Sequence, residues 1–171
     1  QFTALLVFDY QVHYRCAMSS NTNASKAPPR KVLELVERFA SNSARALNEE
    51  DTKATLINPL FTALGWSMDV LDASREVRYE DRVRTKDGSL KAPDYGFYIG
   101  HRLQFYLEAK QPSENIATNA KHAFQTRRYG WSAGIPLAIL TDFEEFAVYD
   151  CTREPRPEDR PEDHRLHYFR F

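Results

Sequence analysis

The sequence predicts an α/β fold in which a mixed central sheet is flanked by helices. Stretches with helical and strand-like patterns follow one another in the order α-α-β-β-β-α-β-β. One run, residues 135–142, is apolar almost throughout, which is typical of a strand buried on both faces. The chain has 171 residues, of which 42% are hydrophobic, enough for one domain with its own core. Together these observations favour an α/β sandwich.

Two helices are expected in the first third of the chain. Residues 30–47 carry an apolar stripe at helical spacing, and a second helix is expected to begin at Asn48, whose side chain can cap it. Acidic residues fill the first turn of the second helix, Pro59 predicts a kink inside it, and Gly65 predicts its end. A third helix is expected over residues 113–129. Its predicted buried stripe consists of Ile116, Ala120 and Phe124.

The predicted strands lie between and after these helices. Two of them, residues 93–100 and 102–110, are joined by a tight turn at Gly100 and His101. A charged, proline-rich stretch, residues 152–165, predicts a loop. The other expected strands are residues 75–83, 135–142, 144–150 and 166–171.

Charge and cysteine content exclude several protein classes. Lys and Arg number 23 against 24 Asp and Glu, so the chain is not strongly basic. A nucleic-acid partner remains open, because only a local patch needs to be positive. Cys16 and Cys151 are too few and too far apart for a disulfide framework or a zinc cluster, which favours a reducing cytoplasm.

The amino terminus differs in character from the rest of the chain. The apolar stretch within residues 1–17 is too short to span a membrane and no basic region precedes it. Met18 opens a polar run that extends to Pro29. We expect residues 1–29 to be a disordered or mis-translated leader, with the true start at Met18 and residues 1–17 as upstream translated sequence; the alternative is an amino-terminal strand of a longer chain.

Acidic residues and a lysine mark the ends of the two adjoining strands. If residues 92–98 and 103–110 pair as a hairpin, Asp94 and Glu108 approach each other and need a cation between them. Mg²⁺, with Mn²⁺ able to substitute for it, is the natural choice, because it prefers oxygen ligands. Lys110 shares a strand face with Glu108, whereas Ala109 points into the core. The alternative is that Asp94 is a turn residue and that Glu108 and Lys110 form a surface ion pair.

Two further elements carry candidate site residues. Gln125 and Tyr129 are one turn apart on the third helix, close in sequence to three cations. These cations, Lys121, Arg127 and Arg128, either bind a phosphate backbone or, for the two arginines, compensate the dipole of the helix end. Glu49 is either a first-turn acid or a further carboxylate of the site.

The motifs in this order resemble the PD-(D/E)xK nuclease superfamily. "PDY" and "EAK" place thirteen residues between Asp94 and Glu108, and "QTRRY" follows on the next helix. Residues 30–150 are similar to the amino-terminal nuclease domain of type I restriction R (motor) subunits and of the fused type IIG restriction–modification enzymes. The resemblance implies a restriction-endonuclease-like fold, with residues 30–171 forming a nuclease domain that we expect to be truncated at its carboxyl end.

The resemblance also implies an activity. Asp94 and Glu108 match the metal-binding acids, Lys110 the catalytic lysine, and Glu49 the acid of the early helix. Gln125 and Tyr129 match the QxxxY pair. The implied reaction is Mg²⁺-dependent hydrolysis of double-stranded DNA in a prokaryotic cytoplasm, away from membranes. The implied partners are methyltransferase, specificity or helicase domains of a larger protein or complex. The alternative is a non-catalytic DNA- or partner-binding domain of the same fold.

Overall fold

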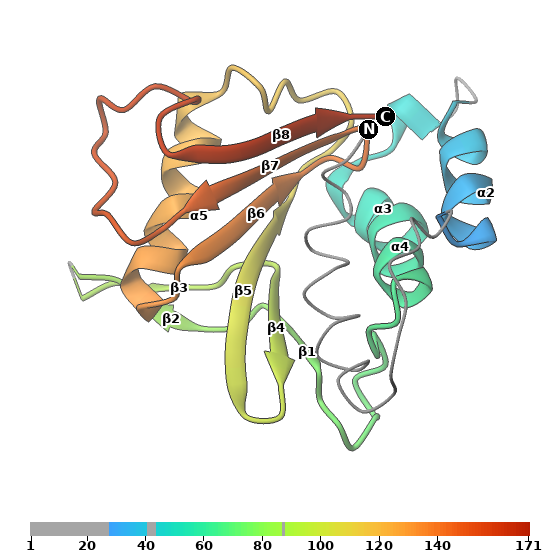
Figure 1. The fold of residues 1–171 in the computed structure, drawn as a ribbon, viewed down its shortest axis with the longest axis horizontal. Helices are drawn as coiled ribbons and strands as arrows, with labels where there is room; N and C mark the ends of the chain where they lie inside the picture. Colours follow the sequence, from blue (N-terminus) through green and yellow to red (C-terminus); the bar gives the residue numbers. More distant parts are fainter. Residues whose placement is uncertain (1–27, 41–43, 87) are drawn as a thin grey trace, which may run out of the picture.

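The computed structural model describes residues 28–40, 44–86 and 88–171, so nearly all of the expected leader lies outside it. A six-stranded sheet forms the centre of the molecule, with the strand order β1-β4-β5-β6-β7-β8 (Figure 1). Only β5 and β6 run parallel, and the other neighbours are antiparallel, so the sheet is mixed as predicted. The strands are β1 (Val77–Tyr79), β4 (Tyr95–Ile99), β5 (Arg102–Ala109), β6 (Leu137–Thr141), β7 (Glu145–Asp150) and β8 (Arg165–Arg170).

Helices cover both faces of this sheet, which confirms the predicted α/β sandwich (Figure 1). On one face α2 (Arg30–Phe39) and α4 (Asn58–Ala63) share a core with the strands, and Trp66 completes it by packing on Phe97 with the ring centroids 5.0 Å apart. On the other face α5 (Ala120–Ala133) covers a second core. Side chains of β5 alternate between the two cores, as the strand period requires.

The second helix is continuous, but a π-helical turn interrupts its α-helical hydrogen bonding just before Pro59. It runs from α3 (Glu49–Thr52) through a π-helical turn (Lys53–Ile57) into α4, and the Asn48 side chain accepts a hydrogen bond from Asp51 N at 2.8 Å, as predicted. Proline has no N–H, and its ring would collide with the carbonyl four residues earlier in an α-helix. The chain widens instead, and Asn58 N donates to the Lys53 carbonyl five residues back. The expected kink is therefore a π turn.

One predicted strand is shorter than expected. Residues 75–83 were predicted as a single strand, but β1 ends at Tyr79 because Glu80 takes a left-handed conformation with φ of 48°. The chain then forms a separate hairpin of β2 (Val83–Arg84) and β3 (Leu90–Lys91), which the sequence analysis did not predict.

The third helix begins later than predicted. Asn119 accepts hydrogen bonds from Lys121 N and His122 N at 3.1 and 3.2 Å, and this cap places the start of α5 at Ala120 rather than at Ser113. The predicted stripe is wrong as well: Ile116 is buried in the preceding loop, and Ala120 and Phe124 are only half-buried. The buried face of α5 consists of Ala123, Thr126, Arg127, Tyr129 and Gly130.

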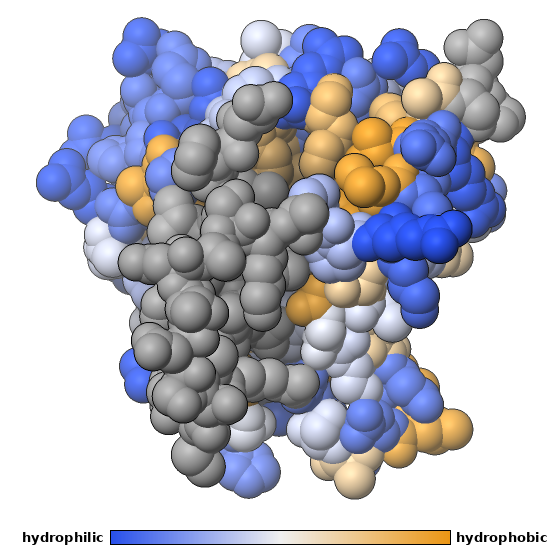
Figure 2. Space-filling view, turned by 45° about the vertical axis from the view of Figure 1, so that its right-hand side comes forward, coloured by the Kyte–Doolittle hydropathy of each residue, from blue (hydrophilic) through white to orange (hydrophobic). Residues whose placement is uncertain are grey.

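The first helix is shorter than the predicted range of residues 30–47: α2 ends at Phe39, and a separate 3-10 turn covers Ala44–Ala46. The tight turn, the central strand and the loop match their predictions. Gly100, with φ of 60°, makes the tight turn between β4 and β5. Residues 137–141 form the parallel strand at the centre of the sheet, and residues 152–164 have no regular secondary structure apart from turns. In the part of Figure 2 that is not grey, hydrophilic residues predominate, and separate hydrophobic patches lie between them. Among the helices of the described residues, none is both long enough and apolar enough to cross a bilayer.

Candidate active site

The β4–β5 hairpin sets the position of the two predicted metal ligands. Its register pairs Tyr95 with Leu107, so that Asp94 and Glu108 follow at the next level, where the strands leave the ladder. Asp94 Oδ2 accepts a hydrogen bond from Ala109 N at 2.8 Å, and Ala109 itself points into the core as predicted. Both carboxylates are largely buried, with 14% and 6% of the side chains exposed.

The two carboxylate oxygens of Glu108 differ in their hydrogen bonding among the described residues. Its Oε1 accepts hydrogen bonds from Lys110 Nζ and Gln125 Nε2, each at 2.9 Å. Its Oε2 is buried and has no hydrogen-bond partner among the described residues. Burial, together with the charge of Asp94, raises the pKa of Glu108 to about 7 although Lys110 opposes the shift. A buried carboxylate oxygen without a partner is costly unless a cation or water binds it.

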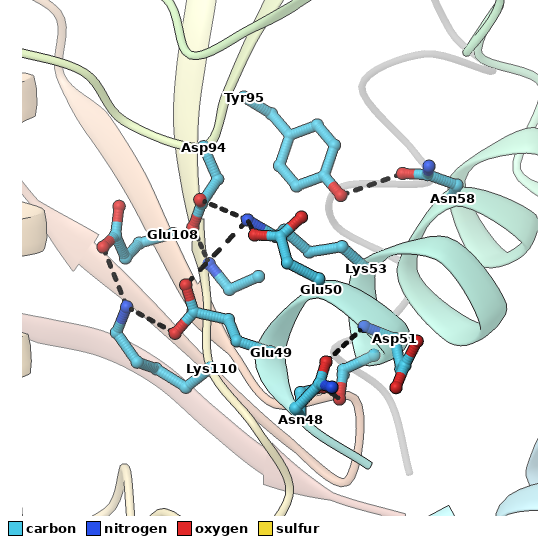
Figure 3. Close-up of polar contacts among 12 residues, drawn as sticks. Asn48, Glu49, Glu50, Asp51, Lys53, Asn58, Asp94, Tyr95, Glu108 and Lys110 are labelled. Atoms are coloured by element: carbon cyan, nitrogen blue, oxygen red, sulfur yellow. Dashed lines mark hydrogen bonds and ion pairs between the residues drawn. The ribbon is translucent and has the colours of Figure 1, made fainter.

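Lys110 joins the strands to the second helix. Its Nζ lies 2.9 Å from Glu108 Oε1 and 3.3 Å from Glu49 Oε2 (Figure 3). Burial lowers the pKa of Lys110, but the carboxylates around it outweigh this and raise the pKa above its ordinary value. Of the two interpretations left open for Glu49, the structure places this residue both in the first turn of α3 and in contact with the site.

Lys53 is a member of this cluster that the sequence analysis missed. It begins the π turn, and its Nζ lies 3.0 Å from Asp94 Oδ1 and 2.5 Å from Glu50 Oε1. Burial lowers the pKa of Lys53, but the hydrogen bond to Glu50 and the charge of Asp94 raise it overall. The only sequence signal was its spacing of four residues from Glu49, which is common on solvated helix faces.

The charges of this cluster leave an excess of negative charge. Four carboxylates surround two ammonium groups, so a divalent cation would balance them when all the carboxylates are ionised. The residues are Glu49, Glu50, Lys53, Asp94, Glu108 and Lys110 (Figure 3).

The donor set fits Mg²⁺ better than a metal that prefers a full set of protein ligands. Within residues 28–40, 44–86 and 88–171, no three His, Cys, Asp or Glu side chains converge to hold a metal by themselves. Mg²⁺ commonly uses one or two carboxylates and retains several waters. The unpartnered Oε2 of Glu108 and the adjacent Asp94 carboxylate meet that requirement.

The predicted Gln–Tyr pair borders Glu108. Gln125 Nε2 donates to Glu108 Oε1 at 2.9 Å and to Tyr129 OH at 2.8 Å, so one amide connects helix α5 to the strand. Both residues also line a groove of about 300 Å³ on the outer side of the site. The groove is completed by Lys91, Lys121, Phe124 and Arg128.

Arg127 does not belong to the predicted phosphate-binding set. Its side chain is 1% exposed, and Nη1 forms an ion pair with Asp159 Oδ2 at 2.6 Å. Arg127 lies on the buried face of α5, one turn from Ala123 and Gly130. The prediction for Arg127 is therefore wrong, whereas Lys121 is exposed and Arg128 is half-buried at the groove.

Comparison with known proteins gives one informative relative. The chain is 34% identical over 153 residues to the type II restriction enzyme and methyltransferase RM.Eco57I of Escherichia coli. The match covers 82% of this chain and 15% of that enzyme, so the chain corresponds to a small part of the relative. No protein-family model matches the chain. No solved structure gives a significant match either.

Proposed function

We propose that this chain is the Mg²⁺-dependent endonuclease domain of a restriction–modification protein and that it hydrolyses phosphodiester bonds of double-stranded DNA. The main support is the unpartnered Oε2 of Glu108, buried beside Asp94 and Lys110. Such an arrangement costs stability in a protein that only binds a partner. It is explained if a cation and a water are bound there during catalysis.

Each residue of the site has a role that follows from its contacts. When bound, Mg²⁺ supplies positive charge for the phosphate in the transition state and helps a water to ionise. Asp94 and Glu108 provide the ligand oxygens, and Gln125 fixes the orientation of Glu108 through its bond to Oε1. The Lys110 ammonium, restrained between Glu108 and Glu49, orients the attacking water or neutralises charge on the phosphate.

The DNA is proposed to enter along the groove on α5. Lys121 and Arg128 contact phosphates there, while Tyr129 and Gln125 form the end of the groove next to Glu108. Phosphate contacts carry no sequence information, so target recognition is assigned to another part of the full-length protein. The name of the Escherichia coli relative includes a methyltransferase, which favours a methyltransferase partner over a helicase motor. We place the protein in a prokaryotic cytoplasm.

Cleavage of plasmid DNA tests this function directly. The chain should convert supercoiled plasmid into nicked and linear forms with Mg²⁺ or Mn²⁺ and should lose this activity in EDTA. Asp94→Asn keeps an acceptor for Ala109 N but removes the charge, so cleavage should fall below detection. Asp69→Asn is the matched control, because Asp69 is exposed and bonds only the backbone of its own turn.

The alternative function is DNA or partner binding without chemistry. It predicts that wild-type chain and Asp94→Asn bind duplex DNA equally and that neither cleaves it in Mg²⁺. Cleavage by wild-type protein that persists at the same rate in Asp94→Asn would instead place the chemistry elsewhere. Circular dichroism of both variants confirms that loss of cleavage is not loss of folding.

A further inference from the structure

The β2–β3 hairpin presents a row of cations on one side. Arg82, Arg84 and Lys86 are exposed, whereas Val83 and Thr85 between them are 6% and 2% exposed. This strict alternation is the two-residue period of an extended chain with one buried face. The buried residues attach the hairpin to the protein, and the cations face solvent together.

The hairpin is fixed against the helix that carries the Gln–Tyr pair. Val83 belongs to the same core as Ala123 and Tyr129 of α5, and Arg128 Nη2 donates to Thr85 Oγ1 at 3.4 Å. Figure 1 shows β2 and β3 beside one end of α5, away from α2. The basic row therefore has a fixed position relative to the candidate active site.

Lys91 links this hairpin to the groove. It is the last residue of β3, and together with Lys121 and Arg128 it gives the groove three cations and no acid. In the part of the chain that the structure describes, neither Lys91 nor Lys121 forms an ion pair. Lys91 precedes Asp94 by three residues, so their Cα atoms are at most ~10 Å apart.

The short distance between Lys91 and Asp94 places the hairpin close to the DNA strand that would be cut. Successive phosphates of one strand advance ~3.4 Å along the axis, so Lys91 can reach a phosphate within about three nucleotides of the one at Asp94. Two cations of the row already have partners within the protein. Lys86 forms an ion pair with Glu154 at 3.3 Å, and Arg84 Nη1 donates a hydrogen bond to Gly88 O at 3.1 Å. Among the described residues, no ion pair or hydrogen bond of this kind engages the side chains of Arg82 or Lys91, so both are available to a polyanion.

We propose that the β2–β3 hairpin is a second DNA-binding element, which holds the backbone of the duplex beside the active site. Lys91 pairs with Val83 and so points to the α5 side of the hairpin, where it contacts the strand that is cut. Arg82 and Arg84 point to the opposite side, where they contact the other backbone of the duplex. This inference rests on the proposed nuclease function. It adds a DNA-binding surface formed by residues outside the catalytic motifs. Binding through the hairpin is independent of sequence, because phosphates are its targets.

Salt-dependent binding tests the hairpin in a chain that cannot cut. In an Asp94→Asn background, the triple variant Arg82→Gln, Arg84→Gln and Lys91→Gln is compared with its parent on a short duplex without metal. Loss of three phosphate contacts should weaken binding and lower the slope of log affinity against log salt by roughly 2–3. A control triple variant, Lys31→Gln, Arg75→Gln and Arg102→Gln, removes the same charge from exposed sites elsewhere and should leave the slope unchanged.

The outcomes separate the two proposals. An unchanged slope in the hairpin variant, or an equal change in the control, would overturn the role of the hairpin whether or not the wild-type chain cleaves DNA. Absence of Mg²⁺-dependent cleavage by the wild-type chain would overturn the nuclease function while the binding slopes still report on the hairpin. Circular dichroism and melting curves show whether each triple variant is folded.

Discussion

Lys53 Nζ lies 3.0 Å from Asp94 Oδ1, so that one oxygen of the predicted metal ligand is bonded to a lysine from a different element. The other oxygen, Oδ2, accepts from Ala109 N. Both oxygens of Asp94 thus have a partner, whereas Glu108 Oε2 has none among the described residues. The π turn that precedes Pro59 begins at Lys53, so an irregularity of the helix lies next to the charged residues of the candidate site.

Lys53→Met is expected to tighten metal binding. The substitution removes one positive charge from beside the carboxylates and frees an oxygen of Asp94 for a cation, so the dissociation constant for Mn²⁺ should fall about tenfold, or ~1.4 kcal/mol. Isothermal titration without DNA measures it. Lys86→Met, at a lysine paired with Glu154 away from the site, should bind Mn²⁺ as wild type does. Weaker binding in Lys53→Met would mean that Lys53 is needed to hold Asp94 in a ligand geometry.

Gln125→Leu should harm catalysis more than Tyr129→Phe does. Gln125 bonds Glu108 directly, and groups that orient metal ligands typically contribute 10–100-fold to metal affinity or rate. Tyr129 OH only accepts from Gln125, so its removal should cost less than about tenfold. Single-turnover cleavage rates and Mn²⁺ affinities of both variants provide the comparison. Equal losses of rate with unchanged metal affinity would indicate that the hydroxyl acts on the DNA itself.

Arg127→Ala is expected to destabilise the fold without affecting the salt dependence of DNA binding. Arg127 is buried, whereas its partner Asp159 is partly exposed. Truncation removes this pair and leaves a cavity, and cavities of this kind typically cost about 2–5 kcal/mol. Arg128→Ala should show the reverse: a small change in stability and a slope lowered by about 0.9. Urea unfolding and binding isotherms over a range of salt measure both. A flattened slope in a folded Arg127→Ala variant would restore Arg127 to the DNA-binding set.

Asp142 should contribute a fall in the unfolding free energy as the pH rises from about 4 to 7. Burial, assisted by the charges of Glu144 and Glu145, raises the pKa of Asp142 to about 7. Over this range the unfolded chain releases its proton and the folded chain retains it, so the folded state loses stability until both forms are ionised. Each pKa unit is worth about 1.4 kcal/mol, and the loss can reach about 4 kcal/mol.

Asp142→Asn isolates that contribution. The amide retains an acceptor for Glu145 N, whose bond to Asp142 Oδ1 is 2.6 Å, but it does not ionise. Urea unfolding of wild type and variant at several pH values should therefore give curves that diverge above pH 4, with the variant more stable at pH 7. Parallel curves would exclude Asp142 as the source of the pH dependence.

Local pattern alone determined much of the fold. The apolar run at residues 137–141, the cap at Asn48 and the turn at Gly100 each lie where predicted, because they depend on neighbouring residues. The predicted hairpin also brings Asp94 near Glu108, but the turn alone does not set their level. The register that starts at Ile99 and Arg102 shifts by one residue between Phe97 and Tyr98, and this bulge brings Asp94 level with Glu108. The predicted start of α5 was too early. Apolar residues before Asn119 have helical spacing, but the helix begins only at Ala120, after the Asn119 cap.

Tertiary structure decided which charged side chains meet. Lys53 reaches Asp94 across 41 residues, and Arg127 reaches Asp159 across 32, in each case between elements whose spacing along the chain predicts no contact. Sequence periodicity identifies the face of an element but not the element packed against it. Whether a cation on that face binds DNA or a buried carboxylate depends on the partner supplied by packing. The sequence therefore predicted that Asp94, Glu108 and Lys110 lie close together, and only the folded arrangement paired Arg127 with Asp159 and brought Lys53 to Asp94 and Lys91 to the groove.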